Sequence, residues 1–223
     1  MPAAPTYVLR YFPIIGRGEP ARILLAAAGV EWAEEHPDWP QAKADQPFGH
    51  LPVLIEKTEG RPDLVVSESG AIERFLARTY GLVPADPRQA VVQEQLRDLL
   101  ADATNAFFEH VVADKEGAGA ALQQKKRDEY EALLDMAIAH QTALLRQNGD
   151  TGRMFGAELS YADIAAYAFF KSQLTFCASL RPDLPARLRP RLTPEIARLV
   201  AAVEADPKIA SYMSASESLA ALL

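Results

Sequence analysis

Two side chains near the start of the chain have the types and the spacing to stabilise an anion. Tyr11 lies in an aromatic and branched run over residues 7–12, and Arg17 lies just before an expected helix start at Glu19-Pro20. A phenol, with an unperturbed pKa of about 10, is a protonated donor at neutral pH, and a guanidinium carries a fixed positive charge. Because ligands of open α/β folds bind at the carboxyl ends of strands beside helix amino termini, we expect chemistry at Tyr11 and Arg17.

Tyr7, in the same run, is the rival tyrosine. It shares the side-chain face of Tyr11 by the two-residue alternation of a strand, but it lies at the amino end, away from the expected site. A core aromatic residue with ordinary hydrogen bonds is a good explanation of Tyr7. The stretch between Tyr7 and Arg17 contains neither Ser nor Cys, and Cys177 lies in the later, helical part of the chain. The sequence therefore favours Tyr11 as the donor.

A small α/β unit is expected to position these residues. Pro13 ends a strand over residues 7–12, because proline cannot donate to a ladder, and Pro20 and Gly29 mark the first turn and the end of a helix over residues 19–28. The sequence then predicts a weak strand over residues 31–35 and a short irregular helix over residues 39–44. A hairpin of two strands is expected over residues 51–55 and 64–66, followed by a helix over residues 69–81 that Ser69 caps and Gly81 ends.

Beyond this unit, the composition becomes rich in alanine and leucine and predicts helices alone. Residues 82–87 contain two prolines and predict a linker between a first domain over residues 1–81 and an all-helical domain over residues 88–223. The periodicity predicts helices at about residues 89–115, 120–148, 161–178 and 194–205. The fold class is therefore α/β followed by all-α.

Ser160 and Asp163 precede the apolar run of residues 164–170. An oxygen at the first position and a carboxylate three residues later can satisfy two amides of a helix start, in a variant of the capping box that usually carries Glu or Gln. A catalytic role is the weaker interpretation, since no histidine lies at a defined spacing from either residue. The pair predicts the start of a buried helix.

The composition limits the possible partners. The 223 residues carry a net charge of −7, whereas nucleic acids and anionic membranes attract surfaces rich in Lys and Arg. The four histidines show no metal-binding spacing and Cys177 is the single cysteine, so neither a metal site nor a disulfide framework is expected. Without a signal-peptide pattern or an apolar run of the ~18 to 20 residues that a membrane helix needs, the sequence predicts a cytoplasmic protein with a small-molecule partner.

A series of short motifs stands in a fixed order along the chain: Tyr11-Phe12 with Gly16-Arg17-Gly18-Glu19, Trp39 with Lys43, Leu51-Pro52-Val53-Leu54, Glu68-Ser69, Asp98 and Ser160-Tyr161-Ala162-Asp163. Together they resemble the cytosolic glutathione transferases of the tyrosine type, most closely the sigma class, with the alpha, mu and pi classes as relatives. The resemblance covers nearly the whole chain. It implies a thioredoxin-like amino-terminal domain, an all-helical carboxyl-terminal domain, a homodimer, and glutathione as co-substrate.

The resemblance gives the anion at Tyr11 an identity, the glutathione thiolate. A free thiol with a pKa of about 8.5 is only a few per cent thiolate at neutral pH, and the thiolate is the nucleophile. Lowering that pKa by about two units requires ~2.7 kcal/mol, which one or two charge-assisted hydrogen bonds near a helix amino terminus can supply. Tyr11 would donate to the sulfur, and Arg17 would add a fixed charge, similar to an arginine of sigma- and alpha-like members.

The resemblance also assigns the glycyl and cysteinyl parts of glutathione to named residues. Trp39 and Lys43, which are donors only, would hold the glycyl carboxylate, although Lys43 without the family is a solvated charge. The backbone of Leu51 would pair with the cysteinyl unit, with a cis bond before Pro52, where a plain strand-start proline is the alternative. His50 stands where the family often carries Gln, so its hydrogen bonds are expected to differ.

The γ-glutamyl end would meet Glu68 and Ser69, with the Ser69 hydroxyl and amide donating to its carboxylate, a role compatible with an N-cap. Glu68 replaces the Gln that sigma-like members usually carry. Asp98 would reach across the dimer to the γ-glutamyl ammonium, and alone it is an exposed helix aspartate. Phe48 matches the aromatic key of alpha-, mu- and pi-like dimers, which sigma-like dimers tend to lack, so the class of the chain stays open. A local packing residue is the alternative interpretation of Phe48.

By resemblance, Phe12, Ile14 and Phe108 would line an apolar pocket for the electrophile. The expected function is a detoxifying enzyme that transfers glutathione to hydrophobic electrophiles. One alternative is a non-catalytic glutathione- or ligand-binding protein, such as a crystallin-like member of the fold. The other is a glutathione-dependent isomerase of the prostaglandin type.

Overall fold

The computed structural model describes residues 5–220, and the side chains of residues 5–215, as two compact units. We call them unit 1, which runs up to Leu82 and resumes at Glu204, and unit 2, which covers Val83–Val203. The carboxyl-terminal segment thus groups with the α/β unit, whereas the sequence predicts it within the all-helical domain.

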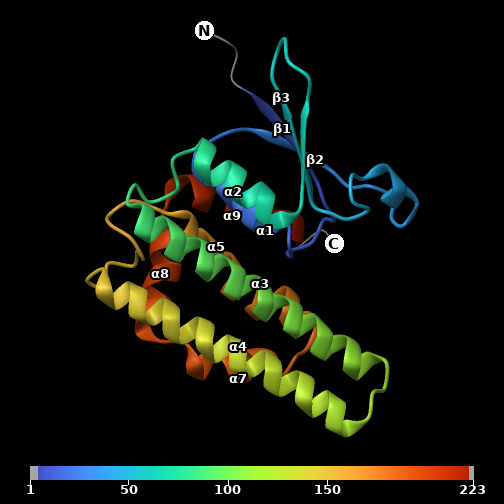
Figure 1. Cartoon of the computed structure of the whole chain (residues 1–223), viewed down its shortest axis with the longest axis vertical. Helices are drawn as coiled ribbons and strands as arrows, with labels where there is room; N and C mark the ends of the chain where they lie inside the picture. The colour runs from blue at the N-terminus through green and yellow to red at the C-terminus, as the bar shows by residue number, and fades with distance from the viewer. Residues whose placement is uncertain (1–4, 221–223) are drawn as a thin grey trace. The chain divides into compact units, whose positions relative to one another are not determined.

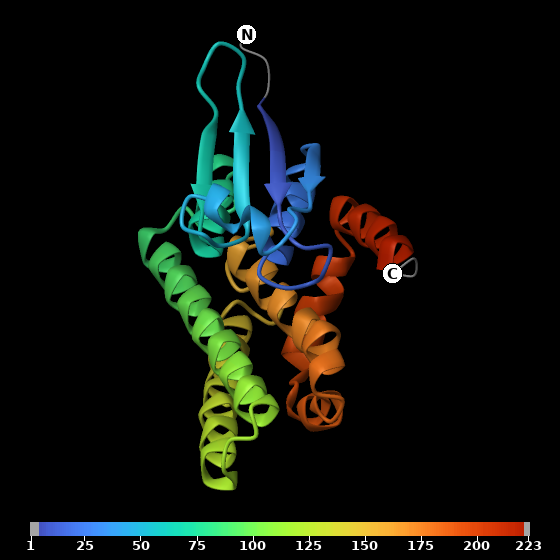
Figure 2. The same ribbon diagram turned by 90° about the vertical axis from the view of Figure 1, so that its right-hand side faces the viewer.

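Unit 1 contains a four-stranded sheet in the order β2-β1-β3-β4 (Figure 2). The strands are β1 (Thr6–Arg10), β2 (Trp32–Glu35), β3 (Val53–Lys57) and β4 (Leu64–Ser67). β1 is parallel to β2 and antiparallel to β3, and β3 and β4 form the predicted antiparallel hairpin. The first strand ends at Arg10 rather than at Phe12, because Phe12 precedes Pro13 and its carbonyl oxygen accepts from the Arg22 side chain (3.0 Å) instead of from a neighbouring strand.

The helices of unit 1 are α1 (Glu19–Ala28), the 3-10 helix η1 (Gln41–Asp45), α2 (Ser69–Thr79) and α9 (Pro207–Ala220) (Figure 1). α1 ends as predicted, since Gly29 is left-handed (φ 71°) and its N–H donates to Ala26 O (2.8 Å). The sequence pattern does not predict α9, which packs against α1. Lys208 Nζ of α9 donates to the carbonyl oxygens of Ala27 and Ala28 (3.3 and 3.4 Å), where the negative end of the α1 dipole attracts a cation.

The start of α2 differs from the prediction. Glu68 occupies the N-cap with φ 70° and ψ 120°, and Ser69 is the first helical residue. The N–H groups of Ala71 and Ile72 both donate to Glu68 O at 3.0 Å. The prediction that Ser69 caps this helix is therefore wrong, because the first helical hydrogen bonds already end on the Glu68 carbonyl. Gly81 follows the helix with the expected left-handed backbone (φ 69°).

The two faces of the sheet carry different side chains. One buried cluster consists of Val8, Val53 and Ile55. By the alternation of a strand, Tyr7 and Leu9 point to the opposite face. α1 and α2 add fully buried side chains to the core of this unit: Ile23, Leu24, Leu25, Ile72 and Leu76. The sheet and its helices thus form a core that fixes the end of β1, where Tyr11 follows.

Unit 2 is built from helices: α3 (Pro87–Lys115), α4 (Ala120–Gln147), α5 (Tyr161–Leu174), α6 (Phe176–Leu180), α7 (Leu184–Leu188), the 3-10 helix η2 (Arg189–Arg191) and α8 (Pro194–Glu204). α3 and α4 form the predicted long pair, and the turn between them contains Gly117 with φ 65° (Figure 1). None of the helices within the described residues is long and apolar enough to cross a membrane.

The capping box at the start of α5 is confirmed. Asp163 Oδ2 accepts from Ser160 N–H (2.9 Å), Ser160 Oγ accepts from Asp163 N–H (3.4 Å), and Asp163 Oδ1 accepts from Met154 N–H (2.8 Å). The single helix predicted over residues 161–178 is instead divided into α5 and α6, because Thr175 leaves the helical conformation (φ −121°, ψ −84°) and bonds its hydroxyl to Lys171 O.

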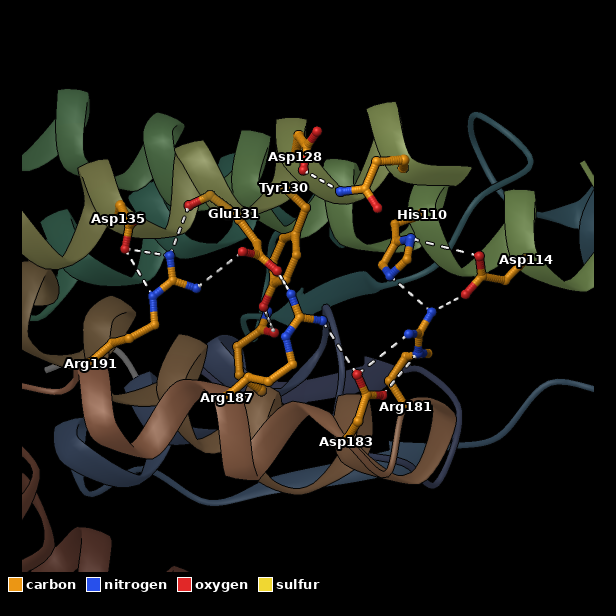
Figure 3. A network of polar contacts seen from close by, with 12 residues as sticks. His110, Asp114, Asp128, Tyr130, Glu131, Asp135, Arg181, Asp183, Arg187 and Arg191 are labelled. Atoms are coloured by element: carbon orange, nitrogen blue, oxygen red, sulfur yellow. Dashed lines mark hydrogen bonds and ion pairs between the residues drawn. The ribbon is translucent and has the colours of Figure 1, made fainter. Parts of the chain in front are cut away.

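A network of arginines and carboxylates joins residues 181–191 to α3 and α4 (Figure 3). Its ion pairs include Arg181 with Asp114, Arg181 with Asp183, Arg187 with Glu131, Arg187 with Asp183, Arg191 with Asp135, and Arg191 with Glu131. These contacts hold a proline-rich segment, in which only short helical turns form, against the long helix pair.

Candidate functional site

Tyr11 is the first residue after β1, and its side chain is buried in unit 1. Its N–H donates to Glu35 O (3.1 Å), and 6% of the residue is exposed. The glycines of the next loop pack on the side chain: an added Cβ at Gly18 would lie 2.5 Å from the ring, and one at Gly16 would lie 2.8 Å from the hydroxyl oxygen. Glycine at these positions therefore lets the loop close over Tyr11.

The Tyr11 hydroxyl oxygen accepts a hydrogen bond from Arg17 N–H (2.9 Å). Burial raises the pKa of the Tyr11 phenol, and the N–H groups of Arg17 and Gly18 with the charges of Arg22 and Arg17 oppose that rise without cancelling it. The phenol is therefore protonated at neutral pH and has an O–H to donate to an anion. The structure thus brings together the two residues that the sequence selects for chemistry, Tyr11 and Arg17.

Tyr7 has the core environment that its alternative interpretation predicts. It is 1% exposed, its hydroxyl donates to Glu56 Oε2 (3.3 Å), and it accepts from the Tyr80 hydroxyl (2.8 Å). Burial, followed by the bond to Tyr80, raises the pKa of Tyr7. Its hydrogen bonds are satisfied within the core.

An aromatic row continues from Tyr11 towards η1. The Phe12 ring lies 5.5 Å from the Tyr11 ring and 5.8 Å from the Trp39 ring, between centroids, with the second pair edge to face. Lys43 is exposed in η1, and its aliphatic stem lies 3.5 Å from the position of a Cβ at Gly49. The two residues expected to bind a glycyl carboxylate, Trp39 and Lys43, are therefore in the segment beside the Tyr11 loop.

The hairpin brings two further predicted segments to one end. Val53 at the start of β3 pairs with Ser67 at the end of β4, so Leu51-Pro52 before one strand and Glu68-Ser69 after the other lie at the same end of the hairpin. The Leu51-Pro52 peptide bond is cis, as the resemblance implies. The Trp39-Pro40 bond is also cis, which the sequence analysis does not anticipate.

Glu68 combines an exposed side chain with a strained backbone. His50 Nδ1 lies 3.7 Å from its Oε1, with 70% and 60% of the two side chains exposed. A non-glycine residue at φ 70° costs roughly 1–3 kcal/mol, and such strain concentrates at functional sites. Ser69 stands at the amino terminus of α2, where helix N–H groups favour an anion.

Of the three remaining predicted residues, one belongs to unit 1 and two belong to unit 2. Ile14 is 40% exposed in the loop after Tyr11. Phe108 and Asp98 are residues of α3 in unit 2. The Phe108 ring contacts those of Phe107 and Phe176, at 5.5 and 6.4 Å between centroids, and the Asp98 side chain is 63% exposed beside Arg97.

Arg22 is a member of the site that sequence reasoning missed. It is 6% exposed on α1, and its guanidinium donates to the carbonyl oxygens of Phe12 (3.0 Å) and Ile14 (2.9 Å). The available signal is a charged residue within the buried run of α1, followed directly by Ile23. Its partners lie in the preceding loop, so sequence periodicity gives no indication of the contact.

Cys177 is a weak candidate for nucleophilic chemistry. Burial raises the pKa of the Cys177 thiol to about 11, so this cysteine is a poor nucleophile at neutral pH. Among the residues that the structure describes, no group of three or more His, Cys, Asp or Glu side chains could hold a metal ion.

Known proteins share both the sequence pattern and the fold. Residues 7–78 match the family described as glutathione S-transferase, N-terminal domain, and residues 97–216 match the glutathione S-transferase, C-terminal domain. Glutathione S-transferase P 1 of Xenopus laevis is 29% identical over 217 residues, which cover 94% of this chain and 92% of that protein. Hematopoietic prostaglandin D synthase of Gallus gallus is 36% identical over 107 residues, 47% of this chain and 49% of that protein. A Nu-class GST from Haemonchus contortus has a similar structure, with a TM-score of 0.73 and 25% identity over 95% of this chain and 97% of that one.

Proposed function

The chain belongs to the glutathione S-transferase family and is a glutathione transferase, and we propose that Tyr11 stabilises the thiolate of its glutathione co-substrate. The observation that carries this proposal is the buried, protonated Tyr11 hydroxyl, which accepts from Arg17 N–H at 2.9 Å and has an O–H to donate. A hydrogen bond to sulfur with nearby positive charge is the interaction that lowers a thiol pKa.

The proposed reaction needs no other group of the protein to change its covalent state. The thiol proton passes to solvent, and Tyr11 donates to the resulting sulfur anion. The sulfur then forms a bond to an electrophilic carbon, and either a leaving anion departs or the adduct takes up a proton. The protein contributes by raising the fraction of thiolate at neutral pH.

The remaining contacts to glutathione are proposed on the resemblance, supported by the position of each residue in its unit. Trp39 and Lys43 would hold the glycyl carboxylate, and His50 with the backbone of Leu51 before Pro52 would meet the cysteinyl unit. Glu68 and Ser69 would bind the γ-glutamyl carboxylate at the start of α2. Asp98 would reach the glutathione of the other subunit of a homodimer, a state that sedimentation at micromolar concentration tests.

The electrophile is proposed to be a small hydrophobic molecule. Phe12 and Ile14 lie in the loop after Tyr11 and present partly exposed apolar surface. The resemblance implies Phe108 as a further pocket residue. The sigma class, the detoxifying role and the cytoplasmic location remain predictions from the sequence.

Replacing Tyr11 tests the proposal. Tyr11→Phe removes one oxygen, so turnover with a chlorinated aromatic should fall by more than about tenfold while binding to a glutathione resin persists. Tyr7→Phe is the matched control, because it makes the same change in a core tyrosine and should leave turnover within about twofold. Unchanged conjugation by Tyr11→Phe would contradict the assignment.

A second candidate, an isomerase, is favoured by the similarity to the protein named hematopoietic prostaglandin D synthase. An isomerase would return glutathione unchanged, whereas a conjugating enzyme consumes it. Incubation with a prostaglandin endoperoxide, an unsaturated carbonyl and a chlorinated aromatic, with the free thiol measured after each, separates the two. Retention on the resin without turnover of any of them would favour a binding protein.

A further inference from the structure

The guanidinium of Arg22 uses all five of its N–H donors inside unit 1. Nη1 donates to Ile14 O (2.9 Å) and to Glu19 Oε2 (3.3 Å). Nη2 donates to Phe12 O (3.0 Å) and to Glu34 Oε2 (2.8 Å), and Nε donates to Glu34 Oε1 (2.7 Å). A residue that is 6% exposed is thus fully satisfied, and each of its bonds has a fixed direction.

Two of these bonds end on the loop that carries the proposed chemistry. The carbonyls of Phe12 and Ile14 lie between Tyr11 and Arg17, so Arg22 holds the loop from the side of α1. The guanidinium carbon also lies 5.6 Å from the centroid of the Tyr11 ring, in the range of a cation–π contact. Its charge is one of the groups that lower the pKa of the Tyr11 phenol against the effect of burial.

The carboxylates that hold Arg22 are themselves anchored on other elements. Glu34 belongs to β2 and also accepts from Trp32 Nε1 (3.2 Å). Glu19 accepts from the Tyr212 hydroxyl of α9, at 3.1 Å to each oxygen. The guanidinium therefore has little freedom to follow a displaced loop.

The two carboxylates neutralise the charge and take three of the five N–H donors, and the carbonyls of Phe12 and Ile14 take the other two, so the same side chain ties the loop to the fixed carboxylates. We propose that Arg22 is a positioning residue of the thiolate site: it holds the loop over residues 12–14 so that the Tyr11 hydroxyl and Arg17 keep their places beside the sulfur. This inference rests on the proposed role of Tyr11.

Arg22→Lys is the decisive variant. Lysine keeps the positive charge, but its single nitrogen cannot reproduce the planar fork that reaches both carbonyls and Glu34. The pKa of enzyme-bound glutathione, followed by thiolate absorbance across pH, should rise by about one unit, and turnover below that pKa should fall about tenfold. At high pH turnover should recover, and the KM for glutathione should change less than about threefold, since the binding groups remain.

Arg10→Lys is the matched control. Arg10 also pairs with a glutamate of β2, with Nε 2.5 Å from Glu35 Oε2, but it lies on the strand before Tyr11 and is partly exposed. Its variant should keep the wild-type thiol pKa. Tyr11→Phe, measured in parallel, separates the two ideas: if it leaves the thiol pKa unchanged, the proposed function fails. If it raises the pKa while Arg22→Lys does not, only the positioning role fails.

Folding is checked by circular dichroism in saturating glutathione, because a ligand that binds the folded state stabilises it. Arg22→Gln, which is neutral and shorter, replaces Arg22→Lys if the latter does not fold, and it should show the same rise in thiol pKa. A folded variant with the wild-type thiol pKa overturns the proposal. Failure of both variants to fold even with glutathione also overturns it, since Arg22 would then be a requirement of the fold itself.

Discussion

The buried arginine of unit 1, Arg22, and the arginine network of unit 2, which Figure 3 shows, pair the same side-chain types in different surroundings. The Arg22 side chain is 7% exposed and its partners Glu34 and Glu19 are 24% and 3% exposed. In unit 2, the Arg191 side chain is 24% exposed and its partner Asp135 is 64% exposed. Water therefore weakens the attraction between Arg191 and Asp135 more than the attraction between Arg22 and its two carboxylates.

The two regions also differ in what their arginines hold. Arg22 donates to backbone carbonyls of the loop that follows Tyr11, whereas Arg181 and Arg187 pair mainly with carboxylates of α3, α4 and their own segment. A pair that water screens contributes about 0–1 kcal/mol, while removing one partner of a buried pair costs about 3–5 kcal/mol. Burial, more than the number of pairs, should decide which region is sensitive to substitution.

The largest effect is expected at Arg22. Arg22→Met leaves the carboxylates of Glu34 and Glu19 without their positive partner, which should lower the free energy of unfolding of unit 1 by about 3–5 kcal/mol. Both tryptophans, Trp32 and Trp39, belong to this unit, so their fluorescence during urea unfolding reports on it. A loss below about 1 kcal/mol would remove the distinction between the two regions.

Asp163 is a fully buried carboxylate in unit 2. Its substitution therefore tests whether burial or the unit itself decides how strongly a residue affects stability. Asp163 accepts from Met154 N–H, Ser160 N–H and the Ser160 hydroxyl, at 2.8, 2.9 and 2.8 Å. Asp163→Asn places an amide N–H against these donors and should cost about 2–3 kcal/mol, measured by circular dichroism during urea unfolding. Asp128→Asn, an exposed position on α4, is the control and should change stability by less than about 0.5 kcal/mol.

His110 gives the unit 2 network a pH dependence. The residue is 2% exposed, and its Nε2 lies 2.9 Å from Arg181 Nη1. Burial, followed by the charge of Arg181, lowers the pKa of His110. The charges of Arg127 and Arg187 lower this pKa further, whereas the charge of Asp114 raises it. Below the unfolded pKa of about 6.5, the unfolded state binds the proton that the folded state resists, so stability falls as pH falls through this range.

Unfolding midpoints from about pH 7.5 to about pH 5.5 test this slope. In His110→Gln, whose side-chain oxygen can still accept from Arg181, the midpoint should fall less on acidification than in the wild type. His140→Gln, an exposed histidine of α4, should keep the wild-type slope. Equal slopes for all three proteins would mean that His110 does not couple protonation to stability.

The sequence correctly predicts helix boundaries that depend on nearby residues. Pro20 and Gly29 bound α1, and Ser160 with Asp163 begins α5, because each signal and its effect lie within one helical turn. The same local logic fails at Ser69, because the left-handed backbone at the preceding residue is one that few non-glycine side chains adopt. The prediction of one continuous helix over residues 161–178 is also wrong, because the apolar pattern continues through Thr175 and gives no sign that the helix breaks there.

The candidate site divides in the same way. The ordered motifs select Tyr11, Arg17 and the hairpin end for the proposed site, because these choices depend on residue type and position. Arg22 depends on contacts with β2 and with a loop that precedes its own helix, so no periodicity predicts it. The one indication in the local sequence is a charged residue within the apolar run of α1.

The smallest effect is expected at Arg191, a partly exposed arginine whose partner Asp135 is 64% exposed. Its Nε donates to Asp135 Oδ1 (2.9 Å), but the carboxylate is mostly in water. Arg191→Met should lower the free energy of unfolding by less than about 1 kcal/mol, and the difference from wild type should shrink further in about 0.5 M salt, where exposed charges are screened. Circular dichroism during urea unfolding measures both. A loss above about 2 kcal/mol that salt does not change would show that the unit 2 network behaves as a buried one, and burial alone would then not explain the sensitivity of Arg22.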